Sequence, residues 1–230
     1  MELLYSNTSI NYFLPYQLLS ADSKSIIKLM PFIEDGFFPG YAEVASNDSN
    51  NKVRTVRVDK SFGDYHVGVT FAPWAVSITF ESQKSVGYHT LVTLLDHVLK
   101  LFNATFEQEN IKGGRVSVVI NDACKSSPEN EGLLYSKFFK LDSKPVEWMF
   151  RNVLVEQFKD EKIFNILSIT KAPAVINVKG NIFEGDSILI NVDKNTHPGN
   201  SDLRFSMRDS GFIKDLLNEA LENIKDVKEL

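Results

Sequence analysis

The sequence of 230 residues is poor in residues that carry covalent or metal chemistry. It has one cysteine, Cys124, so no intramolecular disulfide can form and a cysteine-based metal site is not expected. The four histidines form no HExxH or HxH pattern, and His89 and His97 lie too far apart on one predicted helix to share a metal. The sequence therefore predicts no metal and no cofactor, and the histidines are interpreted as structural or solvent-facing.

A basic surplus and long apolar runs are also missing. Lys and Arg number 25 against 30 Asp and Glu, a net charge of −5, whereas a non-specific nucleic-acid binder needs excess positive charge. No stretch approaches the length of apolar chain that spans a bilayer, and the first residues lack the features of a signal peptide. We expect a cytoplasmic protein with no membrane partner.

Catalytic motifs are absent as well. The chain has no GxSxG, GxGxxG or P-loop pattern, and nothing in the sequence gives Cys124 a base. The polar segment that starts at Asp193 resembles a calcium loop, but it has Pro198 where glycine is required and Arg204 where a bidentate glutamate is required. No catalytic residue is assigned.

What the sequence does have is alternation between strand-like and helix-like patterning. In the first half, we expect an edge strand within Ser9–Leu19 and a short helix within Asp22–Ile33, capped by Asp22 or Ser23. Gly36 to Gly40 predicts a loop, and the polar residues 45–52 predict a turn. Residues 53–80 alternate with a period of two, which predicts an antiparallel meander. Helical spacing over Leu91–Phe106 predicts a long helix that ends at Gly113–Gly114.

The second half repeats this order of patterns. The apolar run at 115–120 predicts a buried strand, and a further strand is expected at 133–141. Residues 145–158 show helical spacing with Pro145 in the first turn. Four strands are expected at 163–169, 174–179, 187–192 and 203–207, with turns at Gly180, Gly185 and residues 195–200. A closing helix over 213–227, capped by Ser210, has one broad apolar face.

These patterns predict an α+β fold with antiparallel sheets in two strand-then-helix halves, each packed by a long amphipathic helix. The predicted boundary separates an N-terminal half, residues 1–112, from a C-terminal half, residues 113–230. One continuous domain is the alternative. Residue-level similarity between the halves is slight, so duplication of one unit is a hypothesis.

Aromatic residues in or near the predicted loops are the remaining signal. Aromatic side chains at turns either fill the core or anchor a protein interface. The candidate binding residues, with a protein interface in mind, are Phe37, Tyr41, Trp74 and Trp148.

The order of elements resembles a sporadically distributed family of bacterial proteins of similar length that has no established activity. The resemblance rests on Phe38-Pro39, on Gly87-Tyr88-His89 leading into the helix, and on the strand Arg115–Asn121. It supplies no catalytic motif, and Arg115 and Asn121 are its best-matching polar positions. The patchy distribution of such families implies cargo of mobile elements, toxin–antitoxin systems or anti-phage defence.

The resulting functional hypothesis is a non-enzymatic cytoplasmic protein-binding or assembly component, with a protein partner or self-association. Acidic net charge would suit a basic partner surface. One alternative is an enzyme whose active site is dispersed and groups a histidine with Cys124 or with carboxylates. The other is a nucleic-acid-binding module with a local basic patch, although Arg54 and Arg57 point to opposite sides of their predicted strand.

Overall fold

A nine-stranded antiparallel sheet forms the body of the protein. The computed structural model describes residues 1–45, 52–139, 145–178, 181–200 and 202–229. Across the sheet lie, in order, β2 (Phe38–Ala45), β3 (Lys52–Phe62), β4 (Tyr65–Ala72), β5 (Ala75–Ser82), β1 (Leu3–Phe13), β7 (Arg115–Lys125), β10 (Asn181–Thr196), β9 (Glu161–Val178) and β8 (Trp148–Phe158). The prediction of a mixed helix-and-sheet fold with antiparallel pairing is confirmed.

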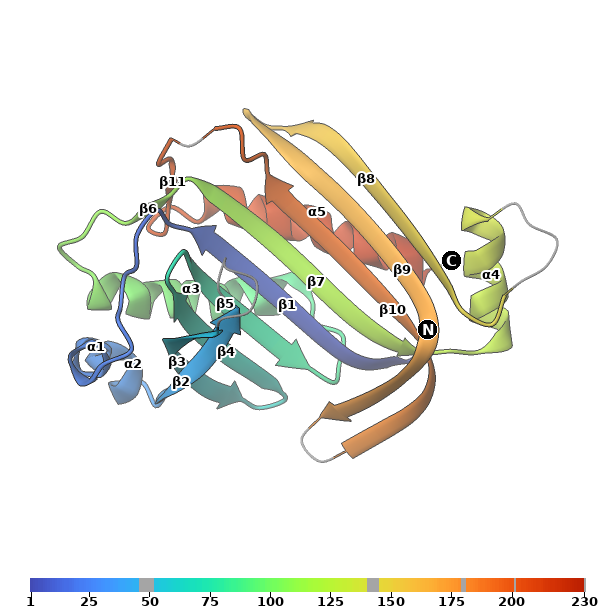
Figure 1. Ribbon diagram of the computed structural model, residues 1–230, viewed down its shortest axis with the longest axis horizontal. Helices are drawn as coiled ribbons and strands as arrows, with labels where there is room; N and C mark the ends of the chain where they lie inside the picture. The colour runs from blue at the N-terminus through green and yellow to red at the C-terminus, as the bar shows by residue number, and fades with distance from the viewer. Residues whose placement is uncertain (46–51, 140–144, 179–180, 201, 230) are drawn as a thin grey trace.

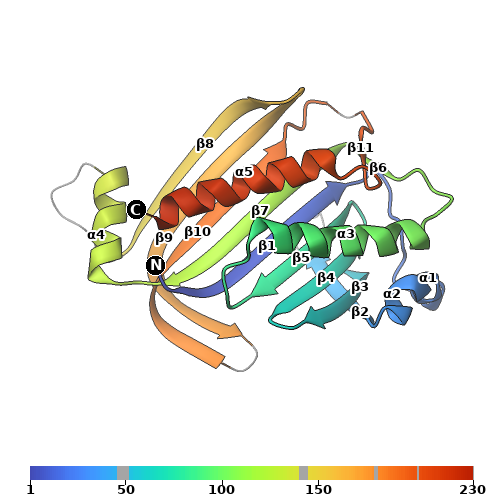
Figure 2. The same cartoon turned by 180° about the vertical axis from the view of Figure 1, so that it is seen from behind.

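Two long helices cover one face of this sheet. Figure 2 shows α3 (Tyr88–Thr105) and α5 (Gly211–Lys228) side by side on that face, which is called here the helix face. The shorter helices are α1 (Ser23–Lys28), α2 (Met30–Glu34) and α4 (Pro128–Phe138), and a second small sheet pairs β6 (Lys112–Gly113) with β11 (Phe205–Ser206). No helix among the described residues lies over the opposite face, which Figure 1 shows toward the viewer and which is called here the open face.

The alternation of side chains along the strands explains this layering. In β1 the side chains of Thr8, Ile10 and Tyr12 are buried, whereas the residues between them are partly exposed. Successive side chains of a strand point to opposite faces, so the buried set marks the helix face. The apolar stripes of α3 and α5 pack there and form one core with the buried residues of the central strands. The prediction of two long amphipathic helices is confirmed.

The strands β1 and β7 lie next to each other in the middle of the sheet. Their register places Ile10 opposite Val118, and both residues are fully buried. The prediction that the first strand lies at an edge is therefore wrong, since β1 also pairs with β5 on its other side. The sheet continues across the predicted boundary at residues 112 and 113.

Two predictions in the second half are reversed by the structure. The apolar pattern predicts a strand at residues 133–141, but α4 covers Pro128–Phe138. The spacing at residues 145–158 predicts a helix, but β8 covers Trp148–Phe158. The capping box of Ser127 and Asn130 starts α4, while the β-branched Val153 and Val155 and the aromatic rings of β8 suit a strand.

The remaining differences concern element boundaries. The predicted loop at Gly36–Gly40 contains the start of β2, and Gly113–Gly114 does not end α3, whose C-cap is Phe106. The predicted strands at 163–169 and 174–179 are parts of one long strand, β9, which continues through Pro173. The predicted strand at 187–192 is part of the longer β10, in which Gly185 lies at a φ of +158° instead of forming a turn. The split of the first helical segment into α1 and α2 follows Pro31, and Asp22 caps α1 as predicted. Most of the predicted turn at 45–52 and the Gly180 turn lie outside the described residues.

Candidate functional site

The open face carries a cluster of charged and polar side chains on β3, β4 and β5. Arg57 donates to Asp59, with its Nε 2.8 Å from Oδ1 and 3.0 Å from Oδ2. His66 Nε2 lies 3.1 Å from Asp59 Oδ1, and His66 faces Glu81 across the β4–β5 pair. We call Arg57, Asp59, His66 and Glu81 the Arg57 cluster.

Gly68 makes room for this cluster. Gly68 of β4 lies opposite Asp59 of β3. A Cβ atom on Gly68 would come within 2.6 Å of Arg57 Nη2 and 2.9 Å of Asp59 Oδ1. A glycine in the interior of a strand weakens the strand, because it packs no side chain. Here the missing side chain leaves room for the guanidinium of Arg57 to reach the carboxylate of Asp59.

A pocket of about 790 Å³ opens beside the cluster. The end of the β9–β10 hairpin curves toward β4 and β5 in Figure 1, and Val175, Ile176 and Asn177 of that hairpin line one side. Tyr5, His66 and Glu81 line the other. Burial raises the pKa of the Tyr5 phenol, and the negative charge of Glu81 adds to this effect. The phenol therefore stays protonated there and acts as a hydrogen-bonding group.

Ser61, His66 and Asp59 form a chain of contacts that resembles a nucleophile relay. Ser61 Oγ lies 3.4 Å from His66 Nδ1, and the other ring nitrogen faces Asp59. A relay of this kind needs a carboxylate whose charge stabilises the imidazolium. Arg57 already neutralises Asp59 through a two-point contact, and the Ser61 to His66 contact is long and exposed. The geometry favours a structural or binding role for these residues over catalysis.

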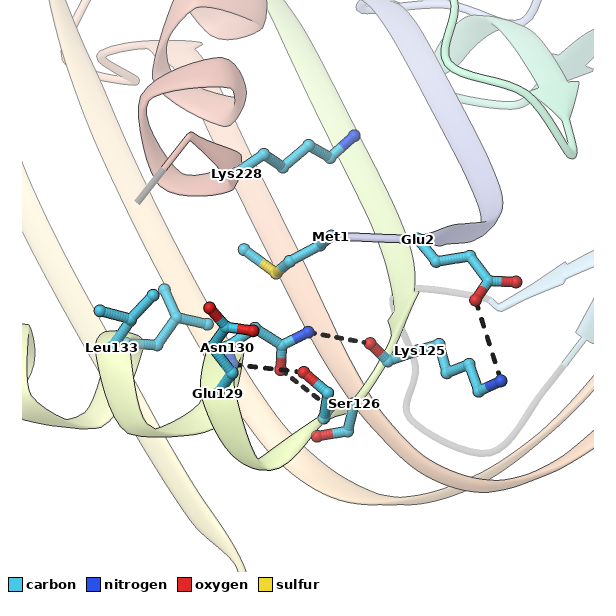
Figure 3. A pocket seen from close by; sticks show the side chains of 10 residues that line it. Met1, Glu2, Lys125, Ser126, Glu129, Asn130, Leu133 and Lys228 are labelled. Carbon is cyan, nitrogen blue, oxygen red and sulfur yellow. Dashed lines mark hydrogen bonds and ion pairs between the residues drawn. The ribbon is translucent and has the colours of Figure 1, made fainter.

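A second pocket, of about 540 Å³, lies where both described ends of the chain meet α4. Figure 3 shows Met1 and Glu2 on one side, Glu129, Asn130 and Leu133 of α4 on another, and Lys228 of α5 above them. Its polar groups contact one another. Asn130 Oδ1 accepts from the Ser127 backbone at 2.9 Å, and Glu2 pairs with Lys125 at 3.8 Å. These contacts stabilise the start of α4, so we do not assign a ligand to this pocket.

The far edge of the sheet has the most exposed apolar strand. Four residues of β8 have side chains in contact with solvent, with exposed fractions of 63% for Met149, 40% for Val153, 47% for Leu154 and 59% for Val155. As the last strand of the sheet, β8 pairs with β9 on one side only. These four residues, with the unpaired backbone beside them, are called here the β8 edge.

The four aromatic residues predicted from the sequence are not brought together as one patch. Phe37 and Trp148 are buried, at 2% and 7% exposure, and pack against Phe32 and Tyr135 respectively. Trp74 is half-buried at the β4–β5 turn, and Tyr41 is 42% exposed on β2 beneath the guanidinium of Arg54. The structure gives Phe37 and Trp148 positions in the core, and an interface role for Tyr41 or Trp74 stays a prediction.

The remaining candidate residues have mainly structural surroundings. Cys124 is fully buried, and burial raises the pKa of its thiol to about 11, which disfavours a reactive thiolate. Arg115 donates to the Thr196 carbonyl at 3.3 Å and lies over the Phe13 ring, while Asn121 accepts from Asn191 at 2.8 Å. His97 contacts Asp35 at 2.8 Å.

Sequence reasoning missed the Arg57 cluster as a unit. The turn at Phe62–Tyr65 fixes the pairing of Ser61 with His66 and of Asp59 with Gly68. That register could have been read from the predicted hairpin, and it puts Arg57, Asp59 and His66 on one face. The contribution of the distant β9–β10 hairpin to the pocket has no local sequence signal.

Comparison of the sequence with protein-family models and with curated proteins returns no match. Within the described residues, His, Cys, Asp and Glu side chains form no group of three that could hold a metal ion. Among the helices described, none combines the length and apolar character needed to cross a bilayer.

Proposed function

We propose that the chain is a non-enzymatic protein-binding component that takes up an extended segment of a partner protein at the β8 edge. A partner strand would add to the sheet beside β8 by backbone hydrogen bonds, and its alternate side chains would cover Met149, Val153 and Val155. This contact requires a partner segment with apolar residues at every second position.

The observation that carries this proposal is the length and regularity of the edge. Natural sheets protect their edges with charged side chains, lysine above all, and with proline, bulges or short strands. β8 is 11 residues long, contains no proline or lysine, and pairs with β9 without a register shift from Trp148 to Phe158, and its charged residues are Arg151 and Glu156 alone. The opposite edge differs, since β2 is 8 residues long and contains Pro39.

The cellular context that we propose comes from the resemblance described above. Proteins of sporadic bacterial distribution suit a defence or toxin–antitoxin complex in the cytoplasm, in which one subunit binds another. This context agrees with an acidic protein whose partner surface is basic.

We infer that the fold contains a duplicated unit, which extends the prediction of two strand-then-helix halves. β1 is followed by α1 and α2, then by the meander β2 to β5, and then by α3. β7 is followed by α4, then by the meander β8 to β10, and then by α5. In both series the meander runs from an outer edge back to the central strand, as the sheet order supports.

Light scattering of the natively co-purified protein tests the proposed function. We expect a mass larger than that of one chain, from a stoichiometric companion or a second copy. Changing Val153→Lys and Val155→Lys together puts two charges on the edge and should return the mass to that of one chain.

The control changes Leu189→Lys, an exposed apolar residue of β10 that pairs with β7 on one side and with β9 on the other. The strand has no free edge at this position, so this variant should keep the larger mass. A wild-type chain that elutes alone as a monomer, and binds none of the proteins encoded beside it, refutes the proposal.

A further inference from the structure

The pocket of about 790 Å³ beside the Arg57 cluster has two unlike walls. One wall belongs to the β9–β10 hairpin, and the other belongs to the open face of the large sheet (Figure 1). The volume lies within the range of pockets that take small-molecule ligands. We call it the hairpin pocket.

The hairpin wall is mainly apolar. β9 pairs with β8 only as far as Lys171, and β10 pairs with β7 only from Ser187 onward. Beyond these residues the hairpin leaves the large sheet as a ribbon of two strands. Val175 and Ile176 of this ribbon line the pocket beside Asn177, and Val175 is 69% exposed. A ligand that covers these apolar side chains removes their surface from water, which favours binding.

The sheet wall is polar and centres on Glu81. Glu81 lies between His66 of β4 and Asn7 of β1 in one row across the sheet. The Tyr5 hydroxyl donates to the Glu81 carboxylate and accepts from Asn7 Nδ2 at 3.4 Å. Glu81 is half-buried, so a ligand in the pocket can reach its carboxylate.

The negative charge of Glu81 is not balanced by the chain. Lys84, the cation in the lining, pairs with Asp64 at 2.5 Å. Arg57 makes a two-point contact with Asp59, so these two residues together are neutral. Within the part of the chain that the structure describes, no lysine or arginine forms an ion pair with Glu81. The lining therefore has one uncompensated carboxylate.

His66 does not supply the missing contact either. Its Nε2 lies 3.1 Å from Asp59 Oδ1, and its Nδ1 lies 3.4 Å from Ser61 Oγ, so both ring nitrogens have partners other than Glu81. An anion in the pocket would be repelled by Glu81. A neutral apolar molecule would remove water from the carboxylate and give it no counter-charge. A cation with an apolar body suits both walls.

We propose that the hairpin pocket binds a small organic monocation, with a primary ammonium group at Glu81 and an apolar body against Val175 and Ile176. The ammonium donates to the Glu81 carboxylate, which the Tyr5 hydroxyl holds in place. The lining residues lie away from the β8 edge, so this ligand site does not depend on the proposed protein partner.

The test uses the whole chain with three amines, namely 2-phenylethylamine, tryptamine and n-hexylamine, each added separately at millimolar concentration. At least one should raise Tm as its concentration increases, since a ligand that binds only the folded state stabilises it. Isothermal titration should then give one site per chain. The alcohol with the same body lacks the charge, and ethylamine lacks the apolar body. Each should bind about tenfold more weakly or worse.

The variant Glu81→Gln should weaken binding of the same amine by about tenfold or more. The matched control is Glu43→Gln, which removes the same charge from an exposed residue of β2 outside the pocket and should bind as the wild type does. Val175→Ser shortens an exposed side chain of the hairpin and should weaken binding about threefold.

The proposal is overturned if none of the three amines raises Tm or gives heat of binding. Alcohols that bind the wild type as tightly as the matching amines also overturn it, and this comparison holds even where Glu81→Gln does not fold. Unchanged binding of the amine to a folded Glu81→Gln chain has the same consequence.

Discussion

Gly68 determines how the side chains of the open face are arranged. The change Gly68→Ala would push a Cβ atom against Arg57, Asp59 and Thr79, whose nearest atoms lie 2.6–2.9 Å away. These side chains would have to move, and the contact between Arg57 and Asp59 would be broken. We expect the free energy of unfolding to fall by about 1 kcal/mol, measured by urea denaturation.

Gly40→Ala is the matched control, because Gly40 also lies in a strand of the same sheet but has no atom within 4 Å of the place that a Cβ would take. It should leave stability unchanged or raise it by up to about 1 kcal/mol. Equal effects of the two substitutions would show that the Arg57 cluster does not depend on Gly68.

The carboxyl group of Asp35 should make the free energy of unfolding depend on pH. Burial alone would raise the pKa of this carboxyl, but hydrogen bonds from Lys60 at 2.7 Å and from His97 at 2.8 Å lower it below its usual value. A carboxyl with a lowered folded-state pKa stabilises the fold above its ordinary pKa, and this contribution is lost as the pH falls through the folded-state value.

The comparison of wild type with Asp35→Asn should therefore change with pH. At pH 7 the variant should be less stable, by about 1 kcal/mol or less, since the ion pair is partly exposed. Below about pH 4 the difference should shrink, because the carboxyl of the wild type also becomes protonated. Urea unfolding at pH 7, 5 and 3 measures this, and a difference that stays constant would contradict the assignment.

At the level of elements, α4 and β8 show where sequence patterns mislead. Both segments are rich in aromatic and apolar residues, and a short apolar run fits either period. The deciding features of α4 are local, namely Ser127 as N-cap, Pro128 at the first position and Glu129 in the first turn. These signals are present in the sequence, and they outweigh the apolar spacing further along.

The same capping residues give a prediction for α4. Ser127 Oγ accepts from the Asn130 backbone N–H at 3.3 Å. Ser127→Ala removes this cap and should lower the free energy of unfolding by about 1 kcal/mol in urea denaturation. Ser136→Ala, which changes an exposed serine near the other end of α4, should have a much smaller effect. Equal losses would show that the cap contributes little.

Whether the β8 segment forms a strand or a helix depends on contacts with residues outside that segment. Phe150 stacks on Phe138 of α4 with ring centroids 4.3 Å apart, and Trp148 packs against Tyr135 and Phe139. These contacts hold β8 against α4 on the helix face, whereas the spacing of apolar residues along 145–158 also fits a helix. Tertiary packing therefore decides an element that local spacing leaves ambiguous.

At the scale of the whole molecule, the central pairing of β1 with β7 was not predictable from the sequence. The sequence predicts a strand in each of the two segments, but nothing in the chain indicates which strands become neighbours across about a hundred residues. The positions of the pockets follow from this pairing. Ser6 and Asp122 become adjacent only because β1 and β7 pair, so the pocket that both residues line on the helix face could not be predicted.

The central pairing also predicts how separated halves behave. Residues 1–112 made alone would expose the edge of β1, and residues 113–230 made alone would expose the edge of β7. Exposed edge strands associate with other chains. We expect each half to aggregate when made separately and the two halves to form a one-to-one complex when produced together, measured by light scattering. Two stable monomeric halves would instead show independent domains.

Met1, Glu2 and Lys228 line one pocket, so the two described ends of the chain lie side by side (Figure 3). A short linker could join them without disturbing the sheet, and the chain could be opened between residues 112 and 113. Such a circular permutant would begin with β7 and finish shortly after α3, yet it would keep every pairing between strands of the large sheet. The two series of elements could then follow each other in either order along the chain. Both orders should give the same fold, because the contacts between strands do not depend on which series comes first.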